Sequence, residues 1–157
     1  MMQQGSTRGG GLAPAVVGGM RFLAVAILGV VVASCATLRP DSPNDEKVKV
    51  VTARATARWQ AIIGKDFAAA YEYMSPATRA TVTPAGFKTV ASRIDYRNAK
   101  VTEATCDGGT CRVKLILTYN AGLSIRGGQS APMNGINTPL EENWVIDKGQ
   151  IWYVWPI

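Results

Sequence analysis

The sequence predicts an α+β domain, with N-terminal helices packed on an antiparallel sheet, preceded by a cleaved signal peptide. Three observations predict this. An unbroken apolar run spans residues 22–32. From Lys47 to Ile94, apolar residues recur at steps of three and four, which is typical of helices. From about Tyr96 the period changes to two, as in strands, and helices followed by strands indicate the α+β class.

The N-terminal segment has the parts of an export signal. Arg21 supplies a positive charge just before the apolar run, and the run is too short to span a bilayer as a helix. We therefore expect residues 1–34 to be a signal peptide. Met20, directly before Arg21, is an alternative start of translation.

The apolar run ends on Val32-Ala33-Ser34-Cys35. This stretch resembles the bacterial lipobox, an aliphatic residue and two small residues before a cysteine. In that family the thiol receives a diacylglycerol, the signal is cut before the cysteine, and the new amino group is acylated. The resemblance implies that Cys35 carries lipid, including palmitate-type acyl chains that hold a protein at a membrane. The alternative is a buried cysteine of an ordinary apolar segment.

Residues 35–46 follow as a polar stretch with two prolines, which predicts a flexible tether with a reach of about 35 Å when extended. The resemblance places the protein in the bacterial cell envelope. In a Gram-negative host, Ala36 after the lipidated cysteine implies the outer membrane, facing the periplasm. The remaining residues, 47–157, are long enough for one folded domain.

The net charge of +6 is a modest basic surplus, and two basic residues, Arg8 and Arg21, fall in the signal peptide. Exported proteins do not ordinarily meet nucleic acid, so we expect no nucleic-acid partner. The chain contains no histidine, and we expect neither a metal site nor a cofactor.

Cys106 and Cys111 flank Asp-Gly-Gly-Thr, a strong turn sequence. Strands that leave such a turn bring facing residues to a distance that suits a disulfide. An exported compartment permits the bond, which closes a short loop and contributes on the order of 2 kcal/mol. A redox pair or a metal site is the alternative, and the spacing favours neither.

Turn and cap residues divide the domain. A first helix is predicted over residues 47–63, with an apolar stripe of Val48, Val51, Ala55, Trp59 and Ile62. Asp66, Ser75 and Thr83 are predicted to begin three further helices. Strands are predicted over residues 96–105, 112–119, 122–126, 138–146 and 150–155, with residues 127–137 as a long loop.

Two stretches, ARWQAIIGKDFAAAYEYMSP at residues 57–76 and ENWVIDKGQIWYVW at 142–155, resemble the nuclear-transport-factor-2-like superfamily, which includes the ketosteroid isomerases. The resemblance covers residues 47–157. It implies a curved antiparallel sheet wrapped around helices, a cystatin-like cone with a cavity at its wide end. Many exported members of this superfamily have no known activity.

Ketosteroid isomerases use an acidic base and an oxyanion hole inside the cavity. That set is not recognisable here, and we assign no catalytic residue. Glu142 shares a strand face with Leu140 and Trp144, so it is the one acidic residue that we consider for the cavity. The alternative is a position at the edge or rim of the sheet, where such a residue is more common. A candidate pocket is formed by Tyr71, Phe87, Tyr119, Glu142 and Trp144; for its aromatic residues the alternative is ordinary core.

Two functions from different classes remain. One is a non-catalytic binding or accessory domain, and the other is a small cavity enzyme of the isomerase or dehydratase type. A buried polar constellation would favour the enzyme, and an apolar or filled cone the binding domain. Four basic residues of the first helix are also expected to share an outward face: Lys47, Arg54, Arg58 and Lys65. This face is proposed to contact anionic lipid or cell-wall material, and the alternative is an ordinary solvated helix face.

Overall fold

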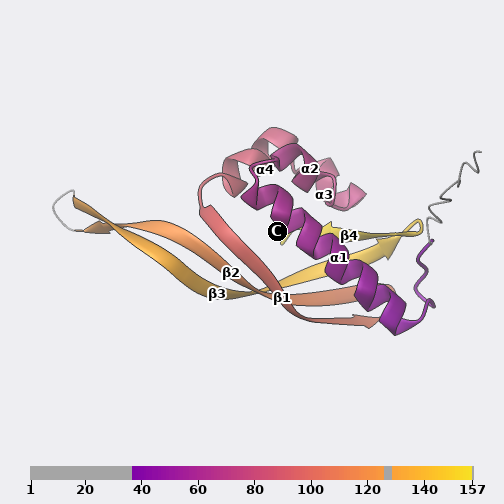
Figure 1. Cartoon of the computed structure of the whole chain (residues 1–157). Helices are drawn as coiled ribbons and strands as arrows, with labels where there is room; N and C mark the ends of the chain where they lie inside the picture. The colour runs from indigo at the N-terminus through magenta and orange to yellow at the C-terminus, as the bar shows by residue number, and fades with distance from the viewer. Residues whose placement is uncertain (1–36, 126–128, 157) are drawn as a thin grey trace, which may run out of the picture. The chain divides into compact units, whose positions relative to one another are not determined.

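The structure is a computed structural model and describes residues 37–125 and 129–156. The predicted signal peptide, the alternative start at Met20 and the predicted lipidation site Cys35 lie outside these residues. Within them, four helices are followed by four strands, which confirms the α+β class (Figure 1). None of the helices in these ranges combines the length and hydropathy needed to cross a bilayer.

Three of the four helices begin where their capping residues predict; α1 begins at Asn44, three residues before the predicted start, and has no side-chain cap. The side chains of Asp66, Ser75 and Thr83 each accept a hydrogen bond from a backbone amide three residues further on, at 3.0–3.1 Å. Proline follows Ser75 and Thr83 at the first helical position, where its missing amide costs nothing. The helices are α1 (Asn44–Ile63), α2 (Phe67–Tyr71), α3 (Pro76–Thr81) and α4 (Pro84–Ala91).

The four strands form one open antiparallel sheet in the order β1-β2-β3-β4, and the helices pack on it (Figure 1). The core-facing side chains of β2 alternate as predicted, with Val113, Leu115 and Leu117 buried against the helices. The strands are β1 (Asp95–Asp107), β2 (Thr110–Ile125), β3 (Gln129–Asp147) and β4 (Gln150–Val154).

The predicted long loop over residues 127–137 is wrong from Gln129 onward, because these residues belong to β3. Residues 122–125, predicted as a short separate strand, continue β2, and Ala121 pairs with Met133. We call this outer part of the hairpin, residues 121–125 and 129–133, the arm. In Figure 1 it extends well beyond the helices. Its pairing lies between distant residues, which a local sequence pattern does not reveal.

The two remaining hairpin turns lie at the opposite end of the sheet. Cys106 and Cys111 face each other across the first turn and form the predicted disulfide, with their Cα atoms 4.1 Å apart. In the second turn Lys148 and Gly149 both have positive φ, of 50° and 81°, which fits a two-residue turn between twisted strands. We call these two turns, together with the start of α1, the turn end.

The segment predicted as a flexible tether is packed against the turn end from Thr37 onward. Leu38 is 3% exposed and belongs to the hydrophobic core, and its amide donates to the carbonyl of Gly149 at 3.0 Å. A side chain at Gly149 would overlap Thr37, so the two backbones approach closely there. We call residues 37–43 the strap; α1 begins directly after it.

Candidate binding groove

The prediction that the four basic residues form an outward face of α1 is wrong, because Lys47 and Arg58 are each only 2% exposed. The reason lies in their spacing. Lys47, Val51 and Arg58 follow one another at helical steps with Ala55 between them, so the two basic residues lie on the same buried stripe as the apolar ones. The stripe itself is confirmed, with Val51, Ala55, Trp59 and Ile62 buried and Val48 half-buried.

The other two residues of the predicted basic face differ from each other. Arg54 is half-buried, and its guanidinium lies over the rings of Tyr73 and Trp152, at 4.9 and 5.4 Å from their centroids. Lys65 follows the end of α1 and is exposed, 3.6 Å from a carboxylate oxygen of Asp95. The four side chains therefore do not form one surface.

Arg58 forms a buried ion pair with Glu142 of β3. Its Nη1 donates to Oε1 of Glu142 at 2.6 Å. The indole of Trp59 donates to the same oxygen at 2.8 Å, and the indole of Trp144 donates to Oε2 at 3.1 Å. The guanidinium also stacks on the ring of Tyr153, 3.7 Å from its centroid. The three donors satisfy both oxygens of the carboxylate, which reduces the penalty for burying it, whereas the Nε–H of Arg58 is buried without a hydrogen-bond partner among the described residues.

Glu142 is only 2% exposed, so the expectation of a rim position for it is wrong. Burial raises the pKa of Glu142, while the charge of Arg58 and the three donated hydrogen bonds oppose that rise. Burial is also the main cause that raises the pKa of Tyr153 to about 12; the charge of Arg58 opposes this rise, and that of Glu142 adds to it. The polar groups that face the Glu142 oxygens are donors, so the arrangement matches the ionised carboxylate.

An open groove of about 310 Å³ lies above this ion pair, between the end of α1, α4 and the last residues of β4. Arg58 and Tyr153 form part of its floor. Three apolar side chains on its walls are unusually exposed, Val90 at 47%, Leu140 at 37% and Ile94 at 36%. The groove is otherwise lined by Trp59, Ile62, Phe87, Ala91, Arg93, Tyr96, Trp155 and Pro156.

Of the five predicted pocket residues, Phe87 lines this groove, and the other four lie elsewhere in the described structure. Tyr71 is core, with its hydroxyl donating to the carbonyl of Val82 at 2.7 Å. Tyr119 is half-buried on β2 and accepts a hydrogen bond from Thr138 at 3.3 Å. Glu142 and Trp144 lie buried beneath the groove.

The most important groove residues that the predicted candidate pocket left out are Arg58, Tyr96 and Trp155. The signal for Arg58 was present, since it lies three residues after Ala55 and four before Ile62 on the buried stripe. Tyr96 and Trp155 stand near the ends of strands, and their approach depends on how the sheet and α4 pack. No periodic pattern along the chain contains that information.

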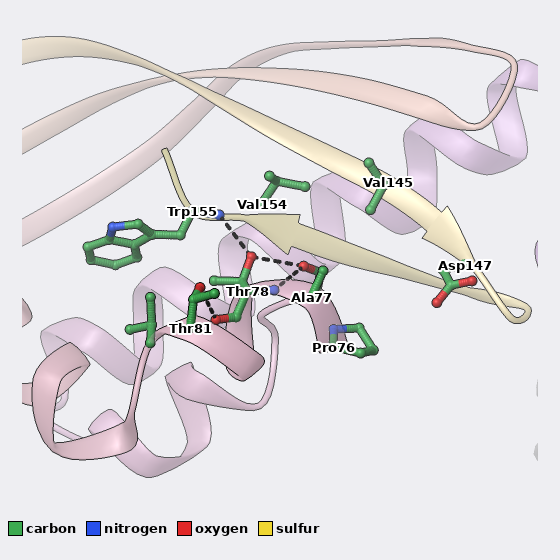
Figure 2. Close-up of a pocket in the computed structure, with 10 residues that line it drawn as sticks. Pro76, Ala77, Thr78, Thr81, Val145, Asp147, Val154 and Trp155 are labelled. Carbon is green, nitrogen blue, oxygen red and sulfur yellow. Dashed lines mark hydrogen bonds between the residues drawn. The ribbon is translucent and has the colours of Figure 1, made fainter. Parts of the chain in front are cut away.

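A second groove, of about 410 Å³, runs between α3 and the last strands (Figure 2). Its hydroxyl groups already have partners in the protein. Ser75 and Thr78 bond to each other at 2.8 Å, and Thr81 donates to the carbonyl of Thr78 at 3.1 Å. The backbone amide of Trp155 donates to Thr78 at 3.4 Å. These side chains cap α3 and join it to β4, so we assign them a structural role.

Within residues 37–125 and 129–156, no group of three or more acidic or cysteine side chains is arranged to hold a metal ion. The polar groups at the floor of the groove and beneath it are one carboxylate, one guanidinium, two indoles and the phenol of Tyr153. This set lacks the several oxygen, nitrogen or thiolate ligands that protein metal sites use.

No family model matches the chain, and no curated protein matches it. A SEC-C motif-containing protein from Rhodopseudomonas palustris is similar in structure, with 18% identity and a TM-score of 0.49, over 65% of this chain and 73% of that one. Aln2 from a Streptomyces species has 17% identity and a TM-score of 0.44, over 71% of this chain and 88% of that one. Neither similarity is high enough to assign a family or a function.

Proposed function

We propose that this chain is a membrane-anchored lipoprotein of the bacterial envelope, whose folded domain binds a ligand without transforming it. In this proposal Cys35 carries the lipid, and the domain is a cone of the nuclear-transport-factor-2-like type. The observation that carries the binding function is the groove. It gathers three of the large apolar side chains that are exposed in the described structure, and such a concentration on a concave surface is typical of ligand sites.

The lining also favours one chemical class of ligand. Two arginines, Arg58 and Arg93, line the groove, and none of its lining residues is acidic. Glu142 neutralises Arg58 from below, which leaves the exposed Arg93 as the main charge at the rim. A molecule with an apolar body and one anionic group would therefore complement the walls and the rim together.

The buried polar cluster is the one observation in favour of an enzyme of the isomerase or dehydratase type. Such an enzyme needs a carboxylate that is free to take a proton from its substrate. Glu142 instead accepts bonds from Arg58, Trp59 and Trp144 and does not line the groove. We therefore favour binding over catalysis.

The anchor is tested by Cys35→Ser, which removes the thiol that would accept the lipid. We expect the wild-type protein in the membrane fraction, with a mass that includes the lipid. The variant should be released or keep its signal peptide. A wild-type mature chain without lipid would contradict the anchor and leave the groove untouched as a site.

The groove is tested by isothermal titration with decanoate as the probe and 1-decanol as the uncharged comparison. Val90→Asp places a negative charge on the groove wall, and we expect it to weaken decanoate binding by roughly tenfold through lost apolar contact and charge repulsion. Met133→Asp is the matched control, because Met133 is 44% exposed but lies on the arm. Equal affinities of the two variants would contradict the assignment of the groove.

A further inference from the structure

The strap is held to the domain by a buried lysine. Lys47 is 2% exposed, and its Nζ donates to the carbonyl of Pro40 in the strap at 2.9 Å and to the carbonyl of Gly108 in the first hairpin turn at 3.0 Å. One ammonium group thus joins the strap, α1 and the sheet. Hydrogen bonds from a charged donor in such a buried place are among the stronger ones in proteins.

The strap also crosses both turns of the turn end. Leu38 inserts its side chain into the core and donates its amide to Gly149. A Cβ atom at Gly109 would lie 3.5 Å from Pro40, which places the strap in van der Waals range of the first turn as well. The strap is therefore part of the folded domain, fixed at three places along its length.

The chain between the strap and the predicted anchor is short. Leu38 is three residues from Cys35, and three residues reach about 10 Å even when fully extended. A lipid on Cys35 would therefore keep the turn end within about 10 Å of the bilayer surface. A free tether of residues 35–46 would have allowed roughly three times that distance.

From these observations we infer that the turn end is the surface of the domain that faces the lipid headgroups, and that the groove faces away from the membrane. This inference rests on the proposed lipid anchor. The groove residues of α1 begin about four turns after its start, on the order of 20 Å further along the helix. The groove then opens to the aqueous compartment, and its ligand arrives from there rather than from the bilayer.

Charge does not produce this orientation. The exposed charged residues of the turn end and strap are of both signs: Arg39, Asp41, Asp45, Asp107, Asp147 and Lys148. A surface of mixed sign has little attraction for anionic headgroups. The short covalent connection sets the orientation, so the domain without its lipid is expected to show no affinity for vesicles of anionic phospholipid.

The test compares two exposed lysines in the lipidated chain, reconstituted in phospholipid vesicles. Lys148→Cys places a nitroxide label at the turn end, and Lys88→Cys places the same label on α4 beside the groove. Nickel chelated to lipid headgroups enhances the relaxation of nearby nitroxides. We expect at least a threefold larger enhancement at position 148 than at position 88.

A third sample carries ten Gly and Ser residues between Ala36 and Thr37 in the Lys148→Cys chain. The insertion adds roughly 18 Å of mean reach, so the enhancement at position 148 should fall toward the value at position 88. Equal enhancement at both positions without the insertion, or a larger one at position 88, would overturn the orientation while the anchor stands. A chain whose mass shows no lipid would overturn the anchor, and the orientation with it. Matching thermal unfolding confirms that each labelled chain is folded.

Discussion

The hairpin of β2 and β3 has two halves, one packed against the helices and one that extends beyond them. In the half beneath the helices, Val113, Leu115 and Leu117 are buried, and each strand has one face in the core. In the arm the same two strands continue as a ribbon beyond the helices, as Figure 1 shows. Both halves share the same antiparallel backbone pairing, but only the first is covered by the helices. Isolated two-stranded ribbons are marginal in water, so the arm depends on the half that is packed.

The prolines of β3 mark where its second edge is free, one in the arm and one in the packed half. Pro132 and Pro139 both lie in β3, and β4 pairs with β3 only over residues 143–147. Proline lacks the amide that a central strand would need, and it is tolerated where one side of the strand is free. Beyond the reach of β4, β3 is such an edge strand on one side. This free edge of β3 runs from the arm into the packed half, as far as residue 142.

The largest effect is expected from breaking the buried ion pair of the packed half. Arg58→Ala leaves the Glu142 carboxylate buried without its cation and should lower the free energy of unfolding by about 3–5 kcal/mol. Lys114→Ala is the matched change in an exposed pair, since Lys114 contacts Glu103 at 3.0 Å in solvent, and it should leave the unfolding midpoint unchanged. Urea unfolding of both variants measures the contrast. Equal stabilities would show that the pair does not support the packed half.

The next largest effect on stability is expected from truncating a buried apolar residue, compared with an exposed one in the arm. Leu115→Ala creates a cavity in the core and should cost about 3 kcal/mol of unfolding free energy. Met133→Ala, in the arm, removes an exposed side chain and should change stability by about 0.5 kcal/mol or less. A cost for Met133→Ala close to that of Leu115→Ala would mean that the arm is packed against a partner in solution.

A smaller loss of folding stability is expected at alkaline pH. The pKa of Tyr153 is raised to about 12 in the folded chain, whereas an unfolded tyrosine titrates near 10. The folded state therefore keeps the proton more tightly, and the stabilisation is complete below about pH 10 and is lost as the pH rises toward 12. Two pKa units correspond to roughly 3 kcal/mol of unfolding free energy. Tyr153→Phe should remove this part of the alkaline loss in unfolding experiments at pH 9, 10.5 and 12. If the variant loses stability with pH as the wild type does, Tyr153 is not the cause of the alkaline loss.

The sequence predicted most of the packed half and little of the arm. Caps such as Asp66 and Ser75 act on neighbouring residues, and the disulfide joins two residues across one turn, so local patterns contained them. The strand at Gln129–Asn137 forms through pairing with a distant segment, and its glycine and proline favour a loop in any local analysis.

The candidate site was harder to predict from the sequence than the helices, because it too depends on contacts between distant segments. Lys47 and Arg58 were assigned to the surface because basic side chains are rarely buried without partners. Their partners, the carbonyls of Pro40 and Gly108 and the carboxylate of Glu142, come from segments far from α1 or outside any helix or strand. Only the packing of the sheet on α1 brings these groups together, so their burial depended on tertiary contacts.

The central claim is that ligands occupy the groove and do not reach the carboxylate beneath it, and the four tryptophan indole signals in a ¹H–¹⁵N spectrum test it most directly. Trp59 and Trp155 line the groove, Trp144 bonds to Glu142 from below, and Trp152 donates to the carbonyl of Asp147 at 3.2 Å, outside the groove. On titration with decanoate, we predict that the signals of Trp155 and Trp59 shift and that those of Trp144 and Trp152 stay in place. A shift of the Trp144 signal as large as that of Trp155, or no shift at Trp155 at saturating decanoate, would contradict the account.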